Sequence, residues 1–401
     1  MAESTSFYSL AKKLNHSTRY LAAGEEVLTT LTIQNIDELR ALFMDNAPAK
    51  LRLARSQQLF SAHPGLKQIE EADSGPEILL RVEAYIFGDT TLSDTDRERI
   101  KDLFPMQVSA LSTTNKTLKP DEVWDLGTST NPVIINLGTL TMEAGSSIVI
   151  RNTVLKMSIE TLVHNGTSPK NTDNFDLGIL GVDGAQGATG DTGPKGGTGG
   201  VGKTANCSGP GGRGLTGSPG TTGGTGNTGG NGKPALQANV SITKGITGAN
   251  PAFVIYTKSG AGGKGGTGGI GGKGGTGGKG GKGADCGCGG TDGGPGGSGG
   301  NGARGGEGGP GGNAINGNTI YVDVIAKDQD KIIKMPTVAD PGTGGDGGGG
   351  GDRGTPGSGG AAGKSSSKGS TGGNGSVGAT GPKGPNSTQK GEPGEILITP
   401  T

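Results

Sequence analysis

The spacing of hydrophobic residues changes along the chain, and it begins with a helical pattern. Residues 35–44 and 93–105 carry apolar side chains at helical spacing, and the second segment has a capping serine, Ser93, and a terminating proline, Pro105. Between them, the apolar run 78–87 predicts a strand. We therefore expect residues 1–118 to form a small α+β domain, and its position suggests attachment or assembly.

From Glu122 onward, short β-branched runs separated by turn residues replace the helical pattern. The runs 133–135, 139–142, 147–150 and 154–159 recur at intervals of 6 to 8 residues. This spacing is typical of a β-solenoid or a tight meander, and we favour the solenoid. Residues 119–177 are therefore expected to form a β-rich, solenoid-like base.

Beyond residue 178 the hydrophobic alternation gives way to glycine at every third position. Three blocks show it, 178–232, 260–312 and 342–394, and in the central block glycine fills two positions of every three. A three-residue period is that of the polyproline II helix, which makes no internal hydrogen bonds. Its backbone groups need partners from neighbouring segments, and glycine permits the close approach.

Each block is interrupted once by a short non-repeating piece, so we interpret the blocks as three hairpins within residues 178–401. The strand-like joins 235–257, 318–335 and 395–399 are expected to extend the base, because a hairpin returns to where it began. The predicted fold class is mainly a non-α, non-β, glycine-rich polyproline II (polyglycine II) helical bundle. It stands on the β-rich base, beside the small N-terminal α+β domain.

Composition and charge exclude several classes of protein. With 88 glycines and only 29% hydrophobic residues, the chain cannot build large conventional cores throughout. The 36 basic and 36 acidic residues balance, so no nucleic-acid partner is expected. No run of 18 apolar residues is present, so we expect no membrane insertion, and the N-terminus has no apolar core typical of a secretory signal.

The hairpin tips carry the candidate recognition residues and all three cysteines. The candidate recognition residues are Lys203, Thr204, Asn206 and Ser208 on the first tip, Asp285, Gly287, Thr291 and Asp292 on the second, and Lys364, Ser365, Ser366, Ser367 and Lys368 on the third. Cys207 lies on the first tip, with Cys286 and Cys288 on the second. One disulfide between these tips and unpaired thiols both remain open, and a Cys-X-Cys metal site is less favoured because it lacks a fourth ligand.

No catalytic or cofactor-binding constellation stands out. Residues 197–204 match the phosphate-loop pattern GxxxxGKT, but a glycine repeat precedes them where that loop needs a buried strand, and no helix is expected after them. His16, His63 and His164 are scattered without the spacing of a metal site or a triad. We expect a protein that is not an enzyme and binds no cofactor or metal.

The GGX and GXX repeats of residues 178–394 resemble the polyglycine II bundles of the springtail antifreeze protein and of the adhesins at phage long-tail-fibre tips. Some triplets, such as those of residues 190–196, are also similar to collagen. The resemblance to the adhesins implies tips that face a surface receptor. The first 170 residues show no resemblance to a known family.

These patterns favour a recognition or adhesion protein that presents its hairpin tips on a rigid bundle. A structural surface, coat or collagen-like filament protein is the alternative, and an ice-binding protein is a lesser one. The expected partner is a cell-surface receptor or another structural subunit, with a homo-oligomer through the N-terminal domain as a further expectation. The expected location is extracellular or on a particle or cell surface.

Overall fold

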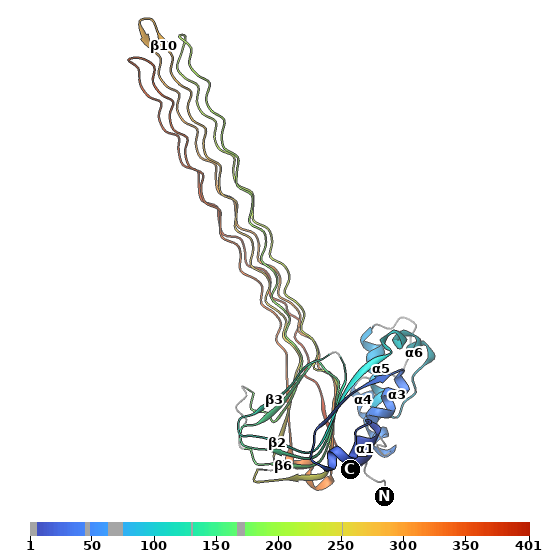
Figure 1. Ribbon diagram of the computed structural model, residues 1–401. Helices are drawn as coiled ribbons and strands as arrows, with labels where there is room; N and C mark the ends of the chain where they lie inside the picture. Colours follow the sequence, from blue (N-terminus) through green and yellow to red (C-terminus); the bar gives the residue numbers. More distant parts are fainter. Residues whose placement is uncertain (1–5, 45–48, 63–74, 130, 167–172, 251) are drawn as a thin grey trace.

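The computed structural model describes residues 6–44, 49–62, 75–129, 131–166, 173–250 and 252–401. Figure 1 shows a β-rich base, a group of helices beside it, and a long bundle of glycine-rich arms that extends away from both. The helices are α1 (Phe7–Lys13), α2 (Thr18–Ala22), α3 (Ile36–Met44), α4 (Ala49–Ala62), α5 (Gly75–Phe87), α6 (Asp94–Ile100), η2 (Lys101–Leu103) and η3 (Ala326–Lys331). Within the described residues, no helix is long and apolar enough to cross a bilayer.

In the described parts of the chain, strands make up two sheets and one tip hairpin. They are β1 (Val27–Ile33), β2 (Met106–Leu118), β3 (Val123–Thr128), β4 (Val133–Met142), β5 (Ser147–Arg151), β6 (Leu155–His164), β7 (Leu177–Leu180), β8 (Ala238–Thr247), β9 (Phe253–Lys258), β10 (Asp285–Cys286), β11 (Gly289–Gly290), β12 (Ile320–Val324), β13 (Ile332–Thr337) and β14 (Ile396–Pro400).

The strand expected over residues 78–87 is wrong, because this segment belongs to helix α5. A short apolar run suits either a strand or a buried helix. Here every residue from Ala84 to Phe87 is buried, without the alternation of a strand that has one solvent-facing side. Arg81 on the same helix pairs with Asp96 of α6 at 2.7 Å, which satisfies a charge that would otherwise be buried alone.

The two sheets of the base are wound from one continuous coil. One sheet has the order β1-β2-β4-β6-β8-β12-β14 and the other has the order β13-β9-β7-β5-β3. All neighbours are parallel except β1, which is antiparallel to β2. The chain alternates between the sheets, so each turn of the coil adds one strand to each.

The glycine hairpins replace one particular corner of this coil. Residues 152–154 make the short corner that leads from β5 to β6. In the next turns a hairpin fills the equivalent corner, between β7 and β8, then β9 and β12, then β13 and β14. Because successive turns are spaced as neighbouring strands, about 4.8 Å apart, the three hairpins leave the base side by side.

The main hydrophobic core lies between the two sheets. Leu140, Ile159 and Val240 of the first sheet pack with Ile150 and Ile255 of the second, and all are essentially excluded from solvent. These residues come from the β-branched runs and from the joins between the glycine blocks. The β-rich base therefore agrees with the sequence pattern.

The helices cover the other face of the first sheet. Phe43 of α3 and Phe87 of α5 are buried with Tyr321 and Leu397 from that face. Arg55 of α4 is 1% exposed and forms an ion pair with Asp323 of β12. The helical segment is therefore packed onto the base through a second core that includes a buried charge pair.

The bundle consists of six glycine arms that bond to one another through their backbones. We number them arm 1 (184–202), arm 2 (211–232), arm 3 (260–283), arm 4 (293–312), arm 5 (342–363) and arm 6 (369–387). Arms 1, 3 and 5 run outward and arms 2, 4 and 6 return. Hydrogen bonds join arm 3 to arms 1, 2, 4 and 5, and arm 4 to arms 2, 3, 5 and 6, whereas arms 1 and 6 each bond to two others.

This arrangement explains where glycine is required. A Cβ added to Gly275 of arm 3 would lie 1.9 Å from the carbonyl oxygen of Gly197, and one added to Gly274 would lie 2.0 Å from that of Gly300. The two glycine rows of arm 3 thus face neighbours on different sides. Outer arms, which have fewer neighbours, keep Thr, Lys, Asp and Pro at exposed positions.

The expectation of a mainly polyproline II helical bundle is therefore wrong as a fold class. The regular structure is β-rich, with parallel and mixed sheets and few helices, and between base and tips the arms contain no helix or strand. The expectation relied on the glycine period, whereas the hydrophobic residues that form the main core lie in the parallel strands.

Candidate functional site at the hairpin tips

The first tip is a tight turn at residues 203–210, between arms 1 and 2. The amide of Gly209 donates to the carbonyl of Asn206 at 3.2 Å, and the amide of Ser208 donates to Asn206 Oδ1 at 3.1 Å. Asn is suited to this role because its short side chain bonds the backbone two residues ahead. The turn leaves Lys203, Thr204, Asn206 and Ser208 exposed.

The second tip is a small β-hairpin between arms 3 and 4. Strands β10 and β11 pair antiparallel around Gly287 and Cys288, which are both exposed. At its base the amide of Ala284 donates to Thr291 Oγ1 at 2.9 Å, and the amide of Thr291 donates to the carbonyl of Ala284 at 2.9 Å. Thr291 therefore serves the closure of the hairpin and is only half-exposed.

The third tip is bonded to the second. The amide of Lys364 donates to Asp285 Oδ1 at 2.6 Å, and the amide of Ser367 donates to Asp292 Oδ1 at 2.7 Å. Both carboxylates are thus occupied in joining two tips. Ser366 adds a third link, because its hydroxyl donates to the carbonyl of Thr291 at 2.8 Å.

A disulfide joins the first tip to the second. It links Cys207 to Cys286, whose Cα atoms lie 5.8 Å apart, while Cys288 is a free, exposed thiol. We call the three connected tips, residues 203–210, 284–292 and 363–369, the tip platform. One covalent link and four hydrogen bonds, the last of them from the Gly363 amide to the Thr291 carbonyl, hold it together, and Figure 1 shows it at the end of the bundle far from the base.

The structure divides the candidate tip residues into two groups. Asp285, Thr291, Asp292 and Ser366 brace the platform. The exposed side chains left to meet a partner include Lys203, Thr204, Ser208, Ser365, Ser367, Lys364 and Lys368. The platform therefore presents lysine ammonium groups and hydroxyls, which donate hydrogen bonds.

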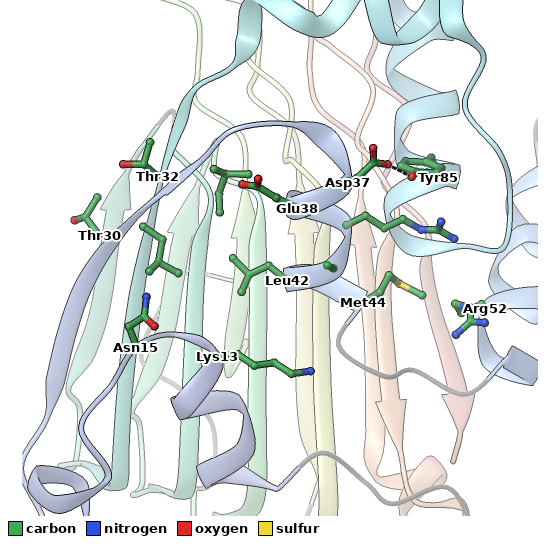
Figure 2. Close-up of a pocket in the computed structure, with 14 residues that line it drawn as sticks. Lys13, Asn15, Thr30, Thr32, Asp37, Glu38, Leu42, Met44, Arg52 and Tyr85 are labelled. Atoms are coloured by element: carbon green, nitrogen blue, oxygen red, sulfur yellow. Dashed lines mark hydrogen bonds between the residues drawn. The ribbon is translucent and has the colours of Figure 1, made fainter.

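A second candidate site lies on the helical side of the base, where a groove of about 1060 Å³ opens. Figure 2 shows its lining, which comes from α1, β1, α3, α4 and α5 and includes Lys13, Thr30, Thr32, Asp37, Glu38, Arg40, Arg52 and Tyr85. No motif indicates this groove in the sequence, because segments distant along the chain assemble it.

The acidic groups of this groove already have partners. Asp37 accepts hydrogen bonds from Arg97, at 2.8 Å, and from the Tyr85 hydroxyl, and both lower the pKa of the carboxyl. Glu38 Oε2 accepts a hydrogen bond from the backbone amide of Gln34 at 2.8 Å. Across the described residues, no group of three or more His, Cys, Asp or Glu side chains is arranged to hold a metal ion.

The two histidines that lie within the described residues, His16 and His164, form hydrogen bonds inside the base. His16 bonds Ser112 and Thr29, at 2.7 and 2.8 Å, and burial lowers its pKa. His164 pairs with Asp176 at 3.0 Å, so its pKa is raised although burial opposes the shift. His63 lies outside the described residues.

Comparisons with known proteins give little further information. No family model and no curated protein matches the chain. Among solved structures, the chain is similar to the nine polyproline type II helical bundle springtail antifreeze protein from Granisotoma rainieri, at 24% identity over 48% of this chain and 93% of that one. The TM-score is 0.10, so the similarity carries no argument about function. None of the comparisons supports a resemblance to phage adhesins or collagen.

Proposed function

We propose that the protein is a non-enzymatic recognition protein that presents the tip platform to a partner, as the receptor-binding tip of a fibre does. The observation that carries this proposal is the joining of the three tips into one platform by the disulfide and by the bonds of Asp285 and Asp292. Loops that are fixed relative to one another lose less conformational entropy on binding than free loops do.

The arms suit the role of a support. Their rows of glycine are committed to contacts with neighbouring arms, so sequence changes there are costly, whereas tip loops can change without disturbing those contacts. The exposed lysines and hydroxyls of the platform favour a partner rich in hydrogen-bond acceptors, on a cell surface or on another structural subunit. A disulfide at the tip supports a location outside a reducing cytosol.

The proposal is tested with a charge reversal at the tip and a matched one on an arm. The tip variant combines Lys364→Glu with Lys368→Glu, and the control combines Lys273→Glu with Lys279→Glu, which are exposed on arm 3. Binding of the labelled full-length protein to intact cells from a panel of bacterial strains is measured. We expect the affinity of the tip variant for the cells to be at least about tenfold lower than that of the wild type. The affinity of the control should remain near that of the wild type.

The readout also includes melting temperature, so that lost binding is not mistaken for lost folding. Equal binding by both variants and the wild type would contradict recognition through the platform. Failure of the wild type to bind any strain would contradict a receptor on the surface of these cells as the partner.

A further inference from the structure

Four strands form the edges of the two sheets of the base: β1 and β14 in one sheet, and β13 and β3 in the other. An edge strand presents a row of unpaired amides and carbonyls, which can pair with another chain. Folded proteins commonly protect such edges with proline, charge or a bulge.

Three of these edges carry such a protection. Strand β14 ends in Pro400 and β13 contains Pro336. Strand β3 contains Asp125, which pairs with Arg151 at 2.7 Å, and its register shifts between Asp125 and Thr128. Each feature interrupts the regular pairing that a further strand would need.

Strand β1 carries no protection of this kind. Its sequence, VLTTLTI, has no charge and no proline, and its register with β2 is continuous from Val27 opposite Ser112 to Ile33 opposite Met106. Among the described residues no segment pairs with its outer edge. Leu28 of this strand is 67% exposed, so its apolar side chain is accessible to a partner.

We propose that β1 is the interface for a second copy of this chain. The two β1 strands pair antiparallel across a twofold axis near Thr30, which makes the sheet continuous between the copies. In this register Leu28 lies opposite Thr32 of the other copy. Every pair then combines apolar or threonine side chains, which stabilise neighbouring strands, and no charges face each other.

The position of β1 is compatible with exposed arms. It lies at one end of its sheet, whereas the strands that adjoin the hairpins, β8, β12 and β14, lie toward the other end. Pairing through β1 leaves the tip platform outside the interface. The dimer and the recognition function are therefore independent, and either can fail without the other.

The test measures the mass of the full-length protein by sedimentation equilibrium at concentrations up to about 100 μM, where even a weak complex is populated. The wild type is expected to form a dimer of 39.4 kDa chains. In Thr30→Lys, two ammonium groups face each other across the axis, and we expect the dissociation constant of the dimer to rise at least about tenfold. Val123→Lys, at an exposed position of the edge strand β3, is the matched control and should dimerise as the wild type does.

A mixing experiment separates a broken interface from a broken fold. Thr30→Glu alone should also be monomeric, but an equimolar mixture with Thr30→Lys should form a heterodimer, because opposite charges then face each other. A monomeric wild type at the highest concentration would overturn the proposal. So would a dimer that Thr30→Lys leaves unchanged, or a mixture that stays monomeric.

Discussion

The arms and the base of this protein are stabilised in opposite ways. In the arms, neighbouring backbones form hydrogen bonds directly, and side chains are excluded from the contact. For example, the amide of Gly275 donates to the backbone carbonyl of Ser218 at 2.8 Å. In the base, side chains such as Leu140 fill the space between two sheets. One region is therefore sensitive to the addition of a side chain, and the other to its removal.

The largest expected effect comes from adding a methyl group to an arm. A Cβ at Gly350 would lie 1.8 Å from the carbonyl oxygen of Gly378, whereas nothing lies within 4 Å of one at the adjacent Gly349. Gly350→Ala should destabilise the protein by about 4 kcal/mol, and Gly349→Ala by less than about 0.5 kcal/mol. Thermal unfolding of the two variants measures the difference. Equal melting temperatures would show that arms 5 and 6 are not in contact.

The next effect comes from removing a side chain from the base. Leu140→Ala leaves a cavity between the sheets and should cost about 3 kcal/mol of stability. Ile333→Ala, at a position that is 46% exposed on β13, is the control and should cost under about 1 kcal/mol. Denaturant unfolding provides both values. A tolerated Leu140→Ala would contradict a tightly packed core between the sheets.

A third comparison is a pH dependence that distinguishes the buried helix–sheet interface from the solvated arms. On an arm, Lys264 pairs with Asp346 in the open, at 2.7 Å. At the interface, burial raises the pKa of the Glu83 carboxyl to about 8, against the hydrogen bonds from Thr319 and Tyr321 that lower it.

At a pH between the pKa of Glu83 in the unfolded protein, about 4.5, and its pKa in the folded protein, about 8, the carboxyl holds a proton only in the folded state. Raising the pH through this range therefore destabilises the protein. The slope for one such group approaches about 1.4 kcal/mol per pH unit. Glu83→Gln is neutral in both states and lacks this slope. Melting temperatures from pH 5 to pH 8 should therefore fall more steeply for the wild type, and parallel curves would contradict a protonated Glu83.

The sequence predicted the β-rich base because short β-branched runs separated by turn residues are a local pattern typical of strands. It did not predict the fold class correctly, because the glycine period does not indicate the two sheets whose strands the hairpins connect. Residues 78–87 were predicted as a strand because an apolar run does not show that α3, α4 and the sheet will surround it. The groove beside β1 has no local signal at all.

At the tips, the sequence placed the cysteines on two neighbouring loops and left their pairing open. Choosing Cys207–Cys286 requires the positions of the two loops, which the contacts of arms 1, 2, 3 and 4 determine. For the same reason, sequence alone does not separate the bracing role of Asp285 and Asp292 from the exposure of Lys364 and Lys368.

The most direct test of the account is hydrogen exchange of the arm amides, followed by mass spectrometry on the full-length protein. In arms 3 and 4 two amides of every three donate to a neighbouring arm, and in arm 6 one of every three does. The account predicts a fraction of slowly exchanging amides in arms 3 and 4 that is about twice that in arm 6. Equal fractions, or exchange at the rate of an unstructured peptide in all arms, would contradict it.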